Sequence, residues 1–157
     1  MKTNAAPNHP NVVGFPPLIF ACVAATSGLL GWWVSAPLAS PAVRWPIGIV
    51  LALAAGGLVT AAERAMHAAG TNIRPSQPAL AIVRNGPFRF TRNPMYLSLC
   101  LLQCALGFFM NNAITLAFVV VLGSLLHFGV VLREERYLEA KFGEPYRELK
   151  RSVRRWI

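Results

Sequence analysis

The sequence predicts an all-α integral membrane protein, a helical bundle of about four transmembrane helices with a C-terminal interfacial amphipathic helix. Composition is the first reason. Of the 157 residues, 55% are hydrophobic and 13% are charged, whereas about a quarter of a soluble domain is charged. Grouping is the second reason, because the apolar residues form blocks of about 18 to 20, the length that crosses a hydrocarbon core.

Four apolar blocks give the predicted spans in order. The first two cover residues 15–36 and 45–65. The third, residues 94–110, is short, and at about 1.5 Å per residue it reaches only about 25 Å. The fourth covers residues 113–132. The Asn111-Asn112 link between the last two is so short that it predicts an antiparallel helical hairpin.

The N-terminal end is predicted to be a flexible tail of residues 1–14, followed by a single membrane domain of residues 15–157. The apolar run after Lys2 is too long for the core of a signal peptide. We therefore expect it to remain as the first span.

Beyond the fourth block, Gly143 predicts a helix stop and Pro145 a new helix start. Basic residues fill the faces between the apolar positions, which predicts a helix in the membrane interface that also covers the end of the bundle. The apolar residues that recur at helical spacing are Phe142, Tyr146, Leu149, Val153 and Trp156.

The distribution of charge predicts the orientation. The net charge is +9, and with four spans every Lys and Arg except Arg44 falls on the side of the two termini. The positive-inside rule places that side in the cytoplasm, and the Ala- and Arg-rich composition favours a bacterial inner membrane. Because the basic residues adjoin span ends, they suit anionic lipid headgroups rather than nucleic acid.

The three cysteines, Cys22, Cys100 and Cys104, all fall within predicted spans. Cys100 and Cys104 share a helix face, but two thiols without further ligands do not make a metal site. We expect small packing residues, with neither a disulfide framework nor a bound metal.

The segment 84–96, RNGPFRFTRNPMY, predicts an anion-binding site. Asn93 is a suitable N-cap and Pro94 a suitable first helical residue, so the third span begins here with its positive dipole end. Arg84, Arg89 and Arg92 surround this end, where an anion would be stabilised. The alternative is that such arginines only anchor the span to headgroups, which is our interpretation of Arg74.

A pair of carboxylates, Glu134 and Glu135, follows the predicted end of the fourth span. A helix C-terminus disfavours negative charge, so the pair suggests a cationic or hydroxyl-rich ligand. The alternative is ion pairing with neighbouring arginines. His127 lies seven residues before Glu134 and is either part of the site or a satisfied buried imidazole.

The hairpin brings the arginine-rich helix start and the carboxylates together, a combination that suits a zwitterionic or cationic small molecule. The sequence contains no glycine-rich dinucleotide fingerprint, no P-loop and no serine-hydrolase elbow.

Two segments, GPFRFTRNPMY and, after the hairpin, REERYLEAKFGEPYRELKRSVRRW, carry a family resemblance. Together with the preceding residues from 71 onward they resemble the isoprenylcysteine carboxyl methyltransferase family, which is related to the phospholipid N-methyltransferases. The resemblance implies a cofactor-binding part over residues 71–157, with S-adenosylmethionine bound at the cytoplasmic end of the bundle. It also implies a lipid-like or prenylated acceptor that arrives from the bilayer.

The resemblance also implies the pocket residues, in two halves at the loop and at the end of the fourth span. The chain departs from many relatives at Asn93, where they have His, and at Ser98, where they have Gly. Together with the anion site, this predicts Arg92, Glu134 and His127 as catalytic residues, and Gly86, Arg89, Asn93, Pro94, Tyr96 and Glu135 as cofactor-binding residues.

The predicted activity is methyl transfer to a carboxylate, amine or thiol of the acceptor. One alternative is an NADPH-dependent membrane reductase, because sterol and related reductases have a similar C-terminal pattern, although with many more spans. The other is a non-catalytic membrane protein.

Overall fold

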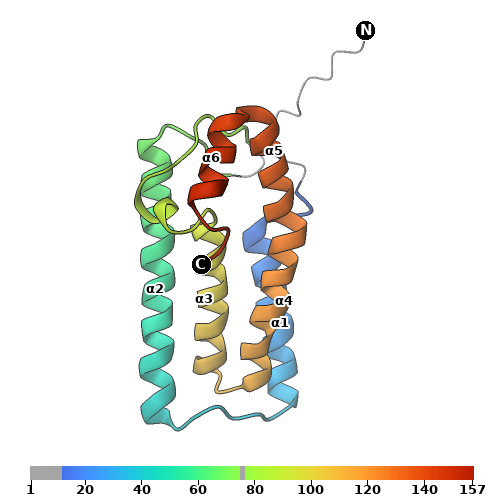
Figure 1. The fold of residues 1–157 in the computed structure, drawn as a ribbon. Coiled ribbons are helices and arrows are strands. Elements are labelled where there is room, and N and C mark those ends of the chain that lie inside the picture. Colours follow the sequence, from blue (N-terminus) through green and yellow to red (C-terminus); the bar gives the residue numbers. More distant parts are fainter. Residues whose placement is uncertain (1–11, 75–76) are drawn as a thin grey trace.

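The computed structural model describes residues 12–74 and 77–157, and within them the chain is helical with a single isolated β-bridge (Figure 1). The helices, in order, are α1 Pro16–Trp33, α2 Pro41–Ala68, the 3₁₀-helix η1 Gly86–Arg89, α3 Pro94–Phe109, α4 Ala113–Leu126, the π-helix η2 His127–Val131, α5 Leu132–Phe142 and α6 Glu144–Ser152.

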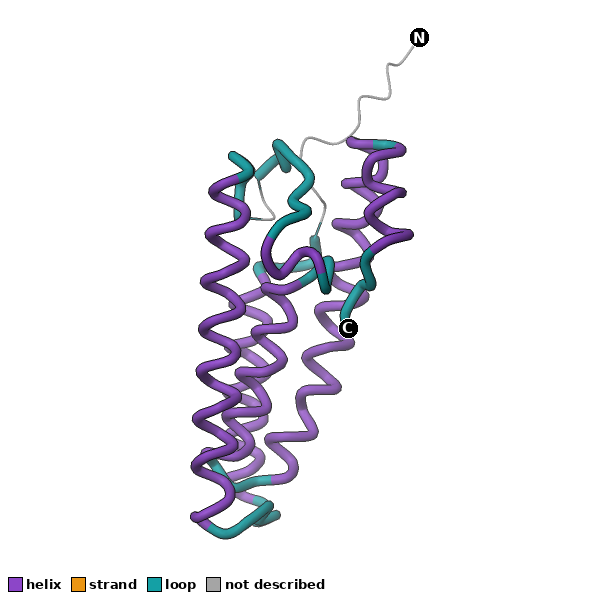
Figure 2. The backbone as a smooth tube through the Cα atoms, turned by 60° about the vertical axis from the view of Figure 1, so that its left-hand side comes forward, coloured by secondary structure: helices purple, strands orange, loops and turns teal. Residues whose placement is uncertain are grey.

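The four apolar helices lie side by side, with α3 in contact with α1, α2 and α4. Three helical runs are long and apolar enough to cross a membrane: Pro16–Trp33, Pro41–Ala68 and Ala113–Phe142. Helix α3, with 16 residues, is the shorter apolar helix that the sequence predicts. The long loop after α2 and the α5–α6 turn gather at the same end of the bundle (Figure 2). The predicted all-α bundle is therefore confirmed.

The helix of the fourth predicted span does not end near residue 132, where the prediction placed a helix C-terminus. The chain passes from α4 through η2 into α5 as one helical run of 30 residues, so Glu134 and Glu135 lie well inside a helix. The prediction ended the span where the polar residues begin. Arg, Glu and Leu are good helix formers, however, and they extend the helix past its apolar part. The argument that these carboxylates oppose a helix dipole therefore does not hold.

The C-terminal region departs from a single amphipathic helix. Gly143 adopts φ 61°, a left-handed value that favours glycine, and the chain turns there into α6. Helix α6 ends at Ser152 and Val153 is extended, so Val153 and Trp156 do not share its apolar face. Tyr146 and Leu149 are buried, which directs that face onto the protein. This is the predicted cover over the end of the bundle.

The predicted N-terminal tail lies mostly outside the described residues. At its end, the Val13 amide donates to the Gly129 carbonyl at 3.1 Å, which ties residue 13 to the π-helix η2.

At the opposite end of the bundle, Asn112 of the hairpin link forms hydrogen bonds both with α4 and with the end of α1. The side chain of Asn112 accepts from the amides of Ile114 and Thr115 at 2.9 and 3.1 Å, which caps α4. Its amide group donates to the carbonyls of Gly31 and Val34 at 3.0 and 2.8 Å. The link therefore fixes the end of α1 as well as the hairpin.

Exposed aromatic residues lie at the end of the bundle that carries the hairpin link. Trp32 and Trp33, at the end of α1, are each 84% exposed, and Trp45 is at the start of α2, with the Arg44 guanidinium 4.9 Å from its ring. Exposed tryptophans at the end of an apolar bundle are typical of a membrane–water interface.

Candidate functional site

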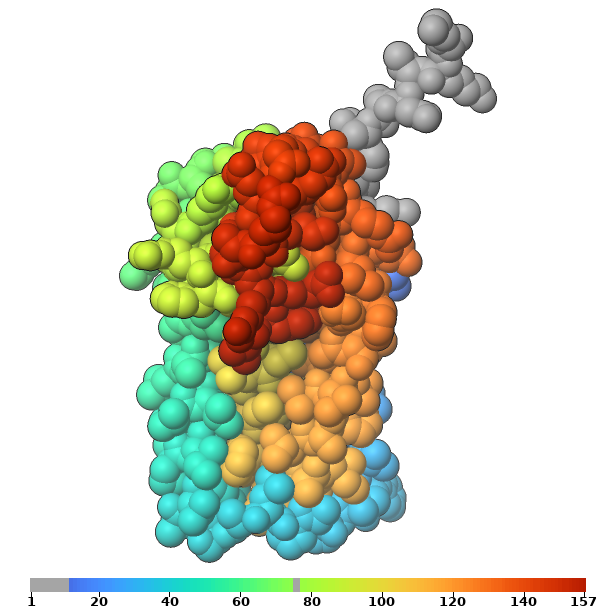
Figure 3. Space-filling model, in the orientation of Figure 1, coloured from blue at the N-terminus to red at the C-terminus, as the bar shows by residue number. Residues whose placement is uncertain are grey.

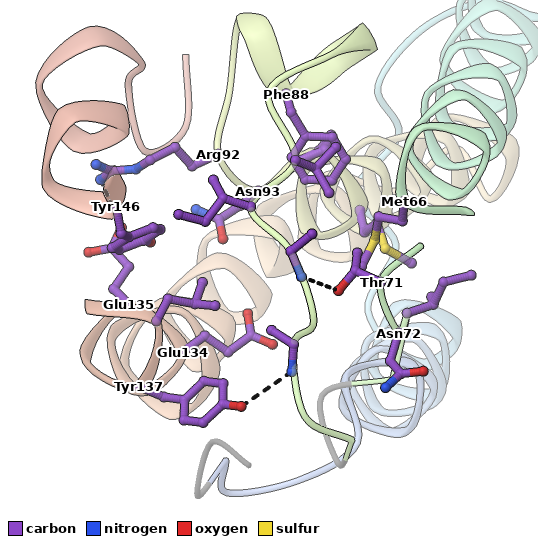
Figure 4. Close-up of a pocket in the computed structure, with 18 of the residues that line it drawn as sticks. Met66, Thr71, Asn72, Phe88, Arg92, Asn93, Glu134, Glu135, Tyr137 and Tyr146 are labelled. Carbon is purple, nitrogen blue, oxygen red and sulfur yellow. Dashed lines mark hydrogen bonds and ion pairs between the residues drawn. The ribbon is translucent and has the colours of Figure 1, made fainter. Parts of the chain in front are cut away.

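A cavity opens at the basic end of the bundle, between the start of α3, helices α5 and α6, and the loop that follows α2 (Figure 4). The volume open to the centres of water molecules is about 140 Å³, roughly ten times the 10–15 Å³ that a single water needs. The space fits a small organic molecule. Apolar side chains, among them Met66, Phe88 and Leu138, form much of the wall.

Glu135 is the centre of an ion cluster in the cavity wall. Its Oε1 accepts from Arg92 Nη2 at 2.8 Å. Arg155 donates to the same carboxylate from two nitrogens, Nε to Oε1 at 2.9 Å and Nη2 to Oε2 at 2.8 Å. The side chains of Glu135 and Arg92 are each only 7% exposed. Both oxygens of Glu135 are therefore already occupied, which is the pairing alternative that the sequence left open.

Glu134 is in a different situation. Tyr96 donates its hydroxyl to Glu134 Oε1 at 2.8 Å. The other oxygen, Oε2, has no partner among the described residues, and the side chain lines the cavity. Of the two adjacent carboxylates, Glu134 is thus the one with an oxygen left for a ligand.

The start of α3 is built differently from the prediction. Asn93 does occupy the N-cap position before Pro94, but its side chain makes no capping hydrogen bond. Its Nδ2 instead donates to the Arg155 carbonyl at 2.9 Å, and its backbone amide donates to Thr91 Oγ1 at 3.2 Å. Asn93 therefore joins the start of α3 to the C-terminal residues.

Hydrogen bonds to side chains hold the loop between α2 and η1 over the cavity. The Leu80 amide donates to Thr71 Oγ1 at 2.9 Å, and the Ala79 amide donates to Tyr137 Oη at 3.2 Å, as Figure 4 shows. Asn72 Nδ2 donates to the Pro78 carbonyl at 2.9 Å. The bond to Tyr137 fixes this wall of the cavity to α5, and the other two hold the loop together.

Tyr146, from α6, closes the side next to Glu135 and Arg92 (Figure 4). Burial, and then the negative charge of Glu135, raise the pKa of the Tyr146 hydroxyl well above its ordinary value. The hydroxyl therefore stays protonated and is a hydrogen-bond donor.

The structure brings only some of the predicted site residues together. Arg92, Asn93, Pro94, Tyr96, Glu134 and Glu135 all line the cavity.

Gly86, Arg89 and His127 do not line it. Gly86 has φ 59° and a Cβ there would lie 3.4 Å from Ala65, so the glycine lets the loop turn against α2. Arg89 is exposed. His127 begins the π-helix, and its Nδ1 accepts from Trp156 Nε1 at 3.2 Å. A π turn contains an extra residue, so the regular spacing that placed His127 on the face of Glu134 does not apply.

The predicted site residues did not include the wall formed by the loop after α2, although the resemblance placed the start of the cofactor-binding part at residue 71. Thr71, Asn72 and Arg74 line the cavity, although Arg74 was interpreted as a headgroup anchor. One signal was present: hydroxyl, amide and guanidinium groups follow the end of α2 on the side where the site was expected. Tyr146 was likewise assigned to an apolar face, and its hydroxyl was the sign of a polar environment.

The donor set suits a zwitterionic ligand. Arg92 Nε is buried and has no hydrogen-bond partner among the described residues, although Arg92 lines the cavity. Buried donors in proteins are nearly always paired, so an orphaned one indicates a missing partner. A carboxylate would satisfy Arg92 Nε, while Glu134 Oε2 would accept from an ammonium or a hydroxyl group.

Comparison with known proteins identifies the family of the chain. An uncharacterized protein of Haemophilus influenzae is 40% identical to the chain over 63 residues, which make up 40% of this chain and the whole of that protein. The profile of the family described as phospholipid methyltransferase matches residues 43–145, from α2 into the first residues of α6. The prediction of a membrane methyltransferase is confirmed at this level, and the isoprenylcysteine branch stays a prediction. The chain belongs to the phospholipid methyltransferase family.

Proposed function

We propose that the protein transfers a methyl group from S-adenosylmethionine to a lipid-like acceptor at the cytoplasmic face of a membrane. The observation that carries the proposal is the cavity in which Arg92 has an unpaired buried donor and Glu134 an unpaired oxygen. S-Adenosylmethionine, when bound, supplies a methyl group on a cationic sulfonium, which a nucleophile accepts by in-line displacement. Family membership supports this chemistry.

Residues of opposite charge would bind different groups of the cofactor. Arg92, with Arg74 at the exposed edge, would hold a carboxylate. Glu134 would accept from the ammonium or the ribose hydroxyls, with Tyr96 orienting its carboxylate. Phe88 and the neighbouring apolar wall offer a surface for an aromatic ring.

The acceptor decides whether a base is needed. A carboxylate acceptor is already nucleophilic and needs only to be oriented. An amine or thiol must lose a proton, and Glu134 would take it only if its free oxygen faces the acceptor rather than the cofactor. His127, predicted for the same role, lies outside the cavity, so we favour Glu134.

The depth of the site supports a lipid-like acceptor. Helix α3 has 16 residues and spans about 24 Å, while α2 has 28 residues and spans about 42 Å. Both reach the far end of the bundle, where Arg44 of α2 donates to the Phe109 carbonyl of α3 at 2.8 Å. In a hydrocarbon core of about 30 Å, the cavity floor at the start of α3 would lie at or below the membrane surface. An acceptor then has its shortest route from the side.

Cofactor binding can be tested with purified protein in detergent by calorimetric titration with S-adenosylmethionine and with NADPH. We expect S-adenosylmethionine to bind and NADPH not to bind. Glu134→Gln is expected to weaken cofactor binding by about 1.5–3 kcal/mol, the contribution of a hydrogen bond to a charged group.

Glu148→Gln is the matched control, because Glu148 lies on α6 outside the cavity in a 3.5 Å surface pair with Arg84. If the Glu134 and Glu148 variants bind the cofactor equally well, Glu134 is not a cofactor ligand. If NADPH binds in place of S-adenosylmethionine, the protein is a reductase.

The acceptor can be tested with a series of acyl- or prenyl-chain compounds and a labelled methyl donor. Shortening the tail is expected to raise the apparent KM, by about 0.8 kcal/mol of binding free energy for each CH₂ removed from an apolar environment. Series with carboxylate, amine and thiol head groups identify the methylated atom. Equal turnover of a water-soluble acceptor without a tail would show that the cavity is filled from the cytoplasm.

A further inference from the structure

The last residues of the chain, 153–157, form a segment outside the helices that we call the strap. In Figure 3 it lies across α3, in the gap between α2 and α4. Arg154 forms a parallel bridge with Thr91, and its carbonyl accepts from the Arg92 amide at 3.0 Å. The Arg155 carbonyl accepts from Thr91 Oγ1 at 3.2 Å and from Asn93 Nδ2 at 2.9 Å. The strap is therefore bonded to the residues that begin α3, beyond the family match, which ends at residue 145.

The strap is also held at its end. Trp156 Nε1 donates to His127 Nδ1 at 3.2 Å, and Trp156 packs against the buried cluster formed by residues of α1, α3, α4 and η2. Between these two attachments, the Arg155 side chain reaches Glu135 as a bidentate fork. Backbone bonds on one side and Trp156 on the other thus fix where Arg155 can point.

Arg155 limits the hydrogen bonds that Glu135 can accept from Arg92. It occupies Glu135 Oε2 and shares Oε1, so Arg92 reaches this carboxylate through Nη2 alone. Arg92 Nε is left buried without a partner among the described residues. Without Arg155, both oxygens of Glu135 would be open, and a guanidinium prefers a two-nitrogen fork to a carboxylate. Arg92 would then pair through Nε as well, and only Nη1 would remain without a hydrogen-bond partner among the described residues.

We propose that Arg155 is a positioning residue, which holds Glu135 so that Arg92 keeps Nε, in addition to Nη1, free for a ligand carboxylate. The proposal rests on the proposed function for the identity of that ligand. The geometric part of the proposal is independent of that function, because it concerns only the pairing of three side chains.

The experiment compares full-length wild type with Arg155→Ala, Arg155→Lys and Arg151→Ala. Arg151→Ala is the matched control, because it removes the same charge from the same region and its side chain is 64% exposed. In each variant, ¹⁵N NMR follows the Arg92 Nε–H resonance, assigned by its loss in Arg92→Lys, and calorimetry measures S-adenosylmethionine affinity. If Arg155→Ala does not fold, both measurements are made on Arg155→Lys in its place.

We expect Arg155→Ala to shift the Arg92 Nε–H resonance and slow its exchange, and to weaken cofactor binding at least tenfold. Arg155→Lys, which carries a point charge rather than a fork, is expected to fall between the alanine variant and the wild type. Arg151→Ala is expected to match the wild type in both measurements.

An Arg92 resonance that is unchanged in both Arg155 variants would overturn the proposal, whatever ligand the cavity takes. If the resonance shifts but the wild type does not bind S-adenosylmethionine, the positioning role stands and the proposed function fails. Trp156 fluorescence, in a background with the other tryptophans replaced by Phe, reports whether the strap stays docked. A red shift in the Arg155 variants would show that Arg155 only docks the strap, which would also overturn the proposal.

Discussion

Replacing Glu135 by glutamine is expected to destabilise the protein by about 3–5 kcal/mol, the cost of removing one partner from a buried ion pair. The carboxylate accepts from Arg92 and Arg155 and is 7% exposed. Glutamine has one acceptor oxygen in place of two, and its amide group would face a guanidinium donor. The two positive charges would then lie close together without compensation.

The measurement is unfolding in detergent, by denaturant or by heat, followed by circular dichroism. The control is Glu148→Gln, because its exposed pair with Arg84 contributes at most about 1 kcal/mol. Equal unfolding free energies for the two variants would show that the cluster around Glu135 does not stabilise the fold.

Replacing Gly107 by valine is expected to disrupt the contact between α3 and α4. A Cβ on Gly107 would lie 2.7 Å from Leu116 Cα and 2.8 Å from its backbone nitrogen. Because the obstacle is backbone, a side-chain rotation cannot relieve it and the two helices must separate. Overpacking costs about 1–3 kcal/mol, and we expect valine to lie at the upper end and alanine lower.

Gly123 on α4 is the matched control, because a Cβ there meets nothing within 4 Å. Gly123→Ala is expected to be neutral or to add up to about 1 kcal/mol through helix propensity. Gly107→Val with unchanged thermal unfolding would show that α3 and α4 are not packed this closely.

The predicted site residues show where sequence reasoning succeeds. Arg92, Asn93, Pro94 and Tyr96 are adjacent in sequence, so a helix start places them together without knowledge of the rest of the fold. The carboxylates lie across a short hairpin, and the helix pairing brought them to the same end. Whether these residues bind the cofactor stays a prediction.

The division of roles between Glu134 and Glu135 was not accessible from the sequence. Adjacent residues on a helix point about 100° apart, so one faces the cavity and Tyr96 while the other faces the arginines. Arg155, which pairs with Glu135, lies 20 residues further along the chain. It reaches Glu135 only because the chain turns back at Gly143. His127 lies outside the cavity for a related reason, because a π turn interrupts the spacing that the prediction assumed.

The sequence by itself determined the helical class, the four apolar helices, the hairpin and the end of the bundle that carries the charge. These follow from block length, hydropathy and charge distribution, which are local or additive properties of the chain. The tertiary structure alone decided which polar groups are saturated and which are free. Glu135, Asn93 and the loop after α2 find partners far away in sequence, and a free donor such as Arg92 Nε is known only when every neighbour is placed. Hydrogen-bond satisfaction depends on the whole packed structure, so a sequence pattern cannot specify it.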